Sequence, residues 1–96
     1  MTHAIMTLRQ YSDSKDRHAA KHFDVTLAEV RANIPRRRRE LEWREYVLSE
    51  FCAGATITTR IWRAIDPDLR RRILRTPRAL RDDALTRDLL SKEDKP

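Results

Sequence analysis

The clearest pattern of apolar and polar positions lies over residues 35–53, where apolar side chains recur at helical spacing. At about 100° per residue, one broad arc of this segment holds Trp43, Val47, Phe51, Leu48, Leu41 and Cys52. An arc wider than the usual stripe of about 100° predicts a helix that is covered from two directions. Pro35 suits the first helical position, and Gly54, the chain's only glycine, suits the residue past the end. The pattern therefore predicts one long central helix over 35–53.

Shorter segments before this helix predict two more helices. The run Thr26-Leu27-Ala28-Glu29 is a capping box and predicts a helix over 26–33. Pro35 disfavours helical geometry in the residue before it and so ends that helix. Residues 13–23 predict a short helix that begins at a Ser or Asp cap. Residues 1–11 show no clear period, and we expect a poorly defined N-terminal arm there.

The segment 55–65 is compatible with two structures. It is rich in β-branched residues, and a strand is indicated by the alternation of Ile57, Thr59 and Ile61. Over a longer window a helical stripe is formed by Ile57, Ile61, Trp62 and Ile65. We favour the helix and keep a strand over 56–62 as the alternative.

Two proline signals divide the rest of the chain. Asp66-Pro67 predicts a helix with Asp66 as its cap and the proline at its first position. Thr76-Pro77 repeats the device and predicts a last helix that runs to about Leu90. Residues 91–96 are polar, and we expect a disordered tail.

The fold class that follows is all-α. We expect a small single-domain helical bundle of four to six short helices around the one longer central helix, over residues 12–90. A chain of 96 residues is large enough for one modest core and too small for a second.

The charge of the chain is positive and unevenly distributed. The net charge is +6, and residues 60–81 alone carry an excess of +6 while the remainder balances. Arginine outnumbers lysine 17 to 4, and the guanidinium fork suits phosphate and carboxylate, although a GC-rich genome would produce the same bias. Such a surface favours polyanionic partners, nucleic acid first and an acidic protein surface second.

Arg36–Arg39 crowd the predicted start of the central helix. Like charge is unfavourable at the positive end of the helix macrodipole, and a bound anion would relieve it. Ion pairs within the helix to Glu40 and Glu42 are the competing explanation. The run is therefore a candidate anion contact. The sequence alone does not distinguish this from a solvated surface whose arginines pair with acids of the same helix.

Two stretches of the chain resemble DNA-binding motifs. The helices over 26–33 and 35–53 are joined by a very short turn, which resembles a helix-turn-helix whose second helix meets the bases; a plain helical hairpin has the same spacing and is favoured. The run TITTRIWRAIDPDLRRRIL is similar to the opening of ribbon-helix-helix proteins, in which a strand with outward Thr58, Arg60 and Trp62 would enter the major groove. Only ten residues separate Asp66 from Thr76, fewer than that fold's first helix needs, so no site residues are taken from it.

The functional hypothesis is a small basic cytoplasmic nucleic-acid-binding protein, regulatory or accessory, that contacts DNA or RNA with arginine-rich helix surfaces. The alternative is an inhibitor or adaptor of the phage or mobile-element kind that docks its basic face on a larger protein or ribonucleoprotein complex, with Trp62 as an interface aromatic. A homodimer is compatible with either. The candidate contact residues are Arg36, Arg37, Arg38, Arg39, Arg60, Arg63, Arg71, Arg72, Arg75 and Arg78.

Catalytic, metal and membrane functions have little support in the sequence. No glycine-rich phosphate loop, paired-cysteine metal pattern or nucleophile elbow is present, so we expect no enzyme, no cofactor and no metal. His18 and His22 have metal-ligand spacing, but no third ligand is signalled. Cys52, the single cysteine, is expected in the core, and no apolar run is long enough for a bilayer.

Overall fold

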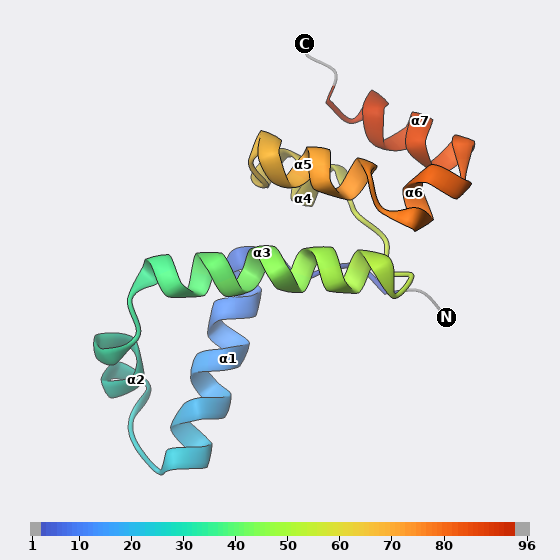
Figure 1. The fold of residues 1–96 in the computed structure, drawn as a ribbon. Coiled ribbons are helices and arrows are strands. Elements are labelled where there is room, and N and C mark those ends of the chain that lie inside the picture. Colours follow the sequence, from blue (N-terminus) through green and yellow to red (C-terminus); the bar gives the residue numbers. More distant parts are fainter. Residues whose placement is uncertain (1–2, 94–96) are drawn as a thin grey trace. The chain divides into compact units, whose positions relative to one another are not determined.

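The protein, described by a computed structural model over residues 3–93, is all-helical (Figure 1). Its helices are α1 (Leu8–Phe23), α2 (Leu27–Asn33), α3 (Arg36–Cys52), α4 (Thr59–Ala64), α5 (Pro67–Leu74), α6 (Pro77–Arg81) and α7 (Asp83–Ser91). Strand-like pairing within residues 3–93 is confined to one isolated parallel bridge between Ala4 and Thr56. The all-α prediction is confirmed. The described residues form seven helices, one more than the upper bound expected, because the predicted last helix is divided into α6 and α7.

The described chain divides into two compact units. Unit 2 comprises residues 6–46, and unit 1 comprises residues 47–93 together with residues 3–5 of the N-terminal segment. Helix α3 contributes its first turns to unit 2 and its last turns to unit 1. The single domain expected over 12–90 and the packing of the short helices around α3 stay predictions.

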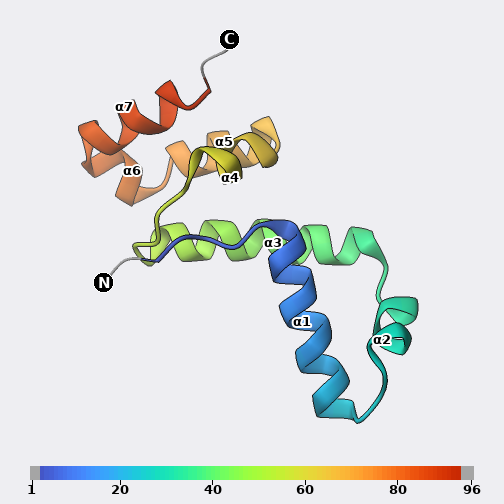
Figure 2. The ribbon, with the colours of Figure 1, turned by 180° about the vertical axis from the view of Figure 1, so that it is seen from behind.

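Unit 2 is built from α1, α2 and the beginning of α3, with α1 and α2 side by side (Figures 1 and 2). Both α1 and α2 begin with a capping box, at Thr7 with Gln10 and at Thr26 with Glu29. The box at Thr26 is as predicted. Helix α1 begins at Leu8 and not near Asp13, and it has 16 residues against the 17 of α3.

Residues 6–11, which fall in the expected arm over 1–11, are held by the part of α3 that belongs to unit 2. The Trp43 indole nitrogen donates to the Met6 carbonyl at 2.9 Å, and the Met6 amide donates to the Tyr46 hydroxyl at 2.9 Å. The rings of Tyr11 and Tyr46 lie 4.8 Å apart. Because these bonds satisfy the backbone of Met6 on both sides, the segment is fixed before α1 begins. Residues 1–2 lie outside the described part of the chain.

Unit 1 begins with the end of α3 and a turn at Gly54, whose φ of 110° only glycine adopts without strain. Thr56 then donates its amide to the His3 carbonyl at 3.0 Å, and Ile5 donates to the Thr56 carbonyl at 3.3 Å. Thr58 caps α4 through the Ile61 amide. The helix favoured within 55–65 is therefore confirmed for residues 59–64. The strand alternative, and with it the ribbon-helix-helix resemblance, is wrong, because Arg60 and Trp62 lie within α4.

The core of unit 1 is formed by apolar residues from most of its helices. These are Val47, Phe51, Ile57, Ile61, Trp62, Ile65, Leu69, Ile73, Ala79 and Leu89. Asp66 and Thr76 cap α5 and α6 with a proline at the next position, as predicted. The break between α6 and α7 falls at Asp82, which is extended and caps α7 by accepting from the Leu85 amide at 3.0 Å.

The predicted tail over 91–96 begins inside structure. Ser91 is the last residue of α7, and the Lys92 ammonium donates to the Ile57 carbonyl. This bond ties the end of α7 to the segment before α4. The remainder of the predicted tail, residues 94–96, lies outside the described residues. None of the helices in residues 3–93 is both long and apolar enough to cross a membrane.

Candidate functional site

Arg39 is the one member of the arginine run that is buried. Its side chain is 10% exposed, and that of its partner Asp16 on α1 is 9% exposed. Nε and one terminal nitrogen of Arg39 donate to the same oxygen of Asp16 at 3.0 and 2.7 Å, and the other terminal nitrogen donates to Glu42 at 2.7 Å. Burial alone would lower the pKa of Arg39, but the hydrogen bonds to Asp16 and Glu42 outweigh it and raise the pKa. The guanidinium of Arg39 therefore holds α3 against α1 through its hydrogen bonds to Asp16.

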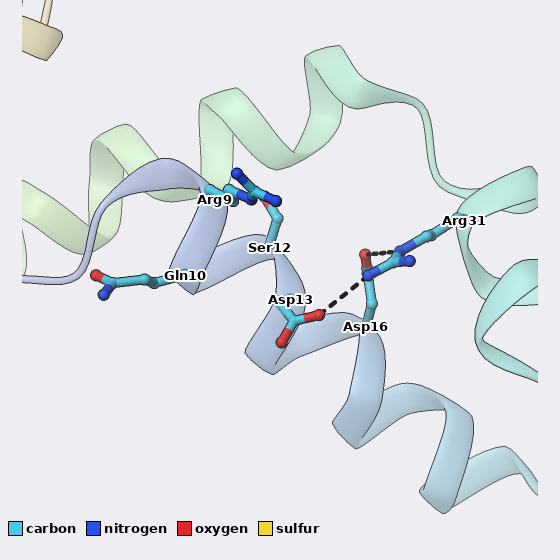
Figure 3. Close-up of a pocket in the computed structure, with 6 residues that line it drawn as sticks. All are labelled: Arg9, Gln10, Ser12, Asp13, Asp16 and Arg31. Atoms are coloured by element: carbon cyan, nitrogen blue, oxygen red, sulfur yellow. Dashed lines mark hydrogen bonds and ion pairs between the residues drawn. The ribbon is translucent and has the colours of Figure 1, made fainter.

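A second arginine reaches the same carboxylate from α2 (Figure 3). Arg31 donates to Asp16 at 3.4 Å and to Asp13 at 3.0 Å, and Asp13 also accepts from Arg17 at 2.8 Å. The hydrogen bond from Arg17 is the largest cause that lowers the pKa of Asp13, and the charges of Arg17, Arg31 and Arg9 add to it. Both carboxylates of α1 are therefore neutralised by arginines of unit 2.

The other three arginines of the run are solvent-exposed and only loosely paired. Arg36 and Arg37 approach Glu40 at 3.5 and 3.6 Å, and Arg38 approaches Glu42 at 3.3 Å. The Arg36 side chain is 89% exposed. Surface pairs of this kind contribute about 0.3–0.5 kcal/mol each. The self-pairing that competed with an anion contact is thus present, and it is weak enough for a polyanion to displace.

The start of α3 and the first turns of α1 enclose a basic hollow of about 440 Å³, lined by Leu8, Arg9, Ser12, Arg36 and Arg39. A neighbouring hollow of about 450 Å³ shares Arg9 and Ser12 and is otherwise lined by Gln10, Asp13, Asp16 and Arg31 (Figure 3). Arg9 is exposed and forms no ion pair within residues 3–93. The apolar pattern did not indicate Arg9 as a site residue, because residues 1–11 show no clear period. The Thr7-Leu8-Arg9-Gln10 capping box was the signal that could have placed it on a helix.

In unit 1, Arg78 has a structural position. One terminal nitrogen donates to the carbonyls of Phe51 and Ala55 at 2.5 and 2.7 Å, and its guanidinium lies 4.3 Å from the centre of the Phe51 ring. The Phe51 carbonyl lies in the last turn of α3, where it also accepts from the Gly54 amide at 3.0 Å, and the Ala55 carbonyl follows the turn at Gly54. Arg78 therefore caps α3. Arg70, which was not among the predicted contacts, donates in the same way to the Trp62 carbonyl at 2.9 Å.

The remaining predicted arginines of unit 1 lie on α4 and α5 and, for Arg75, at the C-cap that follows α5. Arg71 is paired at 3.5 Å with Asp68 in the same helix, and Arg72 also has an interaction partner. Arg60, Arg63 and Arg75 are exposed and form no ion pair with any residue between 3 and 93. The buried residues of these helices are apolar: Ile61 and Trp62 in α4, and Leu69 and Ile73 in α5. Unit 1 therefore presents cations whose charge no described carboxylate neutralises.

Trp62 is fully buried, so it is not available as the interface aromatic that the alternative hypothesis named. It is buried because α4 turns Ile61 and Trp62 inward together, and the Arg70 guanidinium lies 5.9 Å from the centre of its ring. Its indole nitrogen has no hydrogen-bond acceptor among the described residues. Trp43 is also buried, as expected of a core residue.

Two kinds of residue with potential chemistry are solvent-exposed. Cys52, expected in the core, is exposed at the end of α3, because the buried positions of that turn are taken by Phe51 and Ala55. The His18 and His22 rings stack 6.2 Å apart on the exposed surface of α1. Within residues 3–93, no cluster of three or more His, Cys, Asp or Glu side chains has the arrangement of a metal site.

Comparison with known proteins adds no relative from which a function could be transferred. No protein-family model matches the chain, and no curated protein or solved structure matches it significantly. Function must therefore be inferred from the arginines and their partners.

Proposed function

We propose that the protein binds nucleic acid, DNA or RNA, with the exposed arginines of its helices and acts as a small cytoplasmic regulatory or accessory protein. The observation that carries the proposal is the set Arg60, Arg63 and Arg75, which are exposed and have no ion pair among the described residues. Unpaired guanidinium groups keep their full charge for phosphate and form bidentate hydrogen bonds to it. Arg71 and Arg72 would add to this surface of unit 1, and Arg36, Arg37 and Arg38 would form a separate set of contacts on unit 2.

Two of the predicted arginines are not available for contact with a partner. Arg39 is buried against Asp16 and Glu42, and Arg78 caps the end of α3, so we assign both a structural role. An organising role for α3 is supported as well, because its two halves contribute residues to both units. Removal of Arg39 or Arg78 would lower binding by disrupting the structure, which would say nothing about contact.

The proposal is tested by fluorescence anisotropy of a labelled DNA duplex and a labelled single-stranded RNA over a range of salt concentration. The test variant is Arg60→Gln/Arg63→Gln/Arg75→Gln. If these arginines contact phosphates, the log–log slope of affinity against salt should fall by about three units on duplex DNA, roughly 0.9 for each phosphate that is no longer neutralised.

The control has the same charge change at exposed positions outside the proposed surface, Arg17→Gln/Lys21→Gln/Arg87→Gln. It should keep the slope within about one unit of the parent protein. Circular dichroism of all three proteins shows whether helicity is retained. Salt-insensitive binding, an equal decrease of the slope in the control, or no binding at low salt would refute the proposal.

The second candidate function is an adaptor or inhibitor that docks on an acidic protein surface. Two large apolar side chains, Phe23 of unit 2 and Leu80 of unit 1, are 68% and 67% exposed, and each could pack against a protein partner. Poly-glutamate is a direct probe of the acidic partner. Binding of poly-glutamate with no binding of either nucleic acid would favour this candidate, and sedimentation equilibrium of the same sample would show whether the protein is a homodimer.

A further inference from the structure

The basic hollow between α1 and α3 differs from the rest of the arginine surface because it is concave and lies within one unit. Its lining combines two helices: Leu8, Arg9 and Ser12 from the first turns of α1, and Arg36 and Arg39 from the start of α3. Its volume of about 440 Å³ is within the range of about 300–1,000 Å³ of pockets that hold small ligands. A hollow of this kind admits a compact group more readily than a passing polymer strand.

The charge balance around the hollow is positive. Ion pairs within unit 2 join Arg17, Arg31, Arg36, Arg37, Arg38 and Arg39 to the carboxylates of Asp13, Asp16, Glu40 and Glu42. Arg9 is additional to this network. The two acids of α1 pair with Arg17, Arg31 and Arg39, whereas Arg9 acts on Asp13 through its charge alone and forms no ion pair with it.

Two cations and a hydroxyl therefore remain for a ligand. Arg36 is held only by Glu40, at 3.5 Å with its side chain 89% exposed, and Arg9 is unpaired among the described residues. Ser12 contributes an O–H donor, and Figure 3 shows it close to the Arg9 side chain. Arg39 lines the hollow, but Asp16 and Glu42 hold all three of its nitrogens in place.

We propose that this hollow binds a phosphomonoester group. A phosphomonoester carries a charge of about −1.5 to −2 at pH 7 and three acceptor oxygens, which matches two guanidinium forks and one hydroxyl. A phosphodiester within a strand carries one charge and two free oxygens and would leave one arginine unmatched. Two sources share this chemistry, the 5′-phosphate end of a strand and a free mononucleotide. The inference depends on the proposed function for the first source only.

The experiment compares a labelled single-stranded oligonucleotide with a 5′-phosphate to the same strand with a 5′-hydroxyl, at equal ionic strength. Adenosine monophosphate, with adenosine as its control, tests the free source by calorimetric titration. We expect the 5′-phosphate strand to bind about tenfold more tightly than the 5′-hydroxyl strand, the effect of one or two charge-assisted hydrogen bonds. We expect adenosine monophosphate to bind saturably and adenosine not to bind.

The test variant is Arg9→Gln/Arg36→Gln, and Arg17→Gln/Arg37→Gln is its matched control. Arg37 lies in the same turn of α3 as Arg36 and pairs with the same glutamate, but it does not line the hollow. The test variant should lose the preference for the 5′-phosphate, and any loss of affinity that comes from Arg36 as a strand contact should be equal for the two strands. The control should retain the preference. Ser12→Ala, which suits a helix, is a second variant that should reduce the preference without a decrease in helicity.

The outcomes separate this inference from the proposed function. Equal affinity for both strands, together with no saturable binding of adenosine monophosphate, overturns the inference even where both strands bind. A preference that persists in Arg9→Gln/Arg36→Gln overturns it as well. Failure of every strand to bind refutes the proposed function, and saturable binding of adenosine monophosphate that Arg9→Gln/Arg36→Gln abolishes would still support the hollow as a phosphomonoester site.

Discussion

Replacing Asp16 by Asn would test whether a buried ion pair holds unit 2 together. The substitution keeps the size of the side chain and removes its charge, so the packing between α1 and α3 is little altered. In the native protein one oxygen of Asp16 accepts two hydrogen bonds from Arg39, at 2.7 and 3.0 Å, and the two side chains are 9% and 10% exposed. The variant leaves the buried guanidinium with Glu42 as its only charged partner among these contacts.

The expected decrease in stability follows from these distances and exposures. At an effective dielectric constant near 20, two unit charges at 4 Å attract by about 4 kcal/mol, and desolvation of both groups offsets part of this. Removal of one partner of a buried pair costs about 3–5 kcal/mol, because the other charge stays buried. Since Glu42 still accepts from Arg39, we expect the lower end, about 3 kcal/mol of unfolding free energy.

The assay is urea unfolding followed by circular dichroism at 222 nm, because urea does not screen ion pairs as a salt denaturant does. Asp13→Asn is the matched control: it lies on the same helix and also pairs with Arg31, but its side chain is 42% exposed. Solvent screens exposed pairs, so the control should be destabilised much less than Asp16→Asn. Equal destabilisation of the two variants would refute the argument that burial makes the Asp16 pair more stabilising than the exposed Asp13 pair.

Two further predictions concern the tryptophans and the acid stability of α1. Trp43→Phe removes the donor to the Met6 carbonyl, whereas Trp62→Phe removes an indole N–H that no described residue accepts. In the same urea assay, Trp43→Phe should therefore be less stable than Trp62→Phe by about 2 kcal/mol of unfolding free energy. Equal stability of the two variants would contradict this. The pKa of Asp13 is lowered, chiefly by the hydrogen bond from Arg17. Its stabilisation is therefore present above the unfolded value of about 3.9 and lost as pH falls through the folded pKa. Asp13→Asn should make the melting temperature depend less steeply on pH below about pH 4, and an unchanged slope would contradict this prediction.

The parts of the fold that the sequence predicted are those with local chemistry. The capping box at Thr26 and the Asp-Pro and Thr-Pro starts at Asp66 and Thr76 are confirmed, because each signal uses contacts between residues at most three positions apart. The start of α1 was not predicted, although Thr7 and Gln10 form the same kind of box. The first turns of α1 have no helical periodicity of apolar residues, so the capping box was the only sequence signal for this helix start.

The arrangement of the site could not be predicted in the same way, because it depends on contacts between distant residues. Arg36–Arg39 are alike in sequence, and only the packing of α1 on α3 places Asp16 beside Arg39, 23 positions earlier in the chain. The basic hollow joins Arg9 to Arg36 by the same packing. Arg78 caps α3 from 23 positions beyond Ala55. Which arginines are structural and which are available is thus a property of the tertiary structure.

This division among the arginines determines which experiments can be interpreted. A block substitution of Arg36–Arg39 would remove the buried pair with Asp16 together with three exposed charges, so weaker binding could follow from the unfolding of unit 2 alone. The same confusion arises in unit 1 if Arg78 is changed together with Arg75, since Arg78 satisfies the carbonyls at the end of α3. Variants chosen by partner avoid it: replacing Arg60, Arg63 and Arg75 removes charge without breaking a described ion pair. Binding that falls in these variants while the urea midpoint stays constant is therefore evidence for contact with a polyanion.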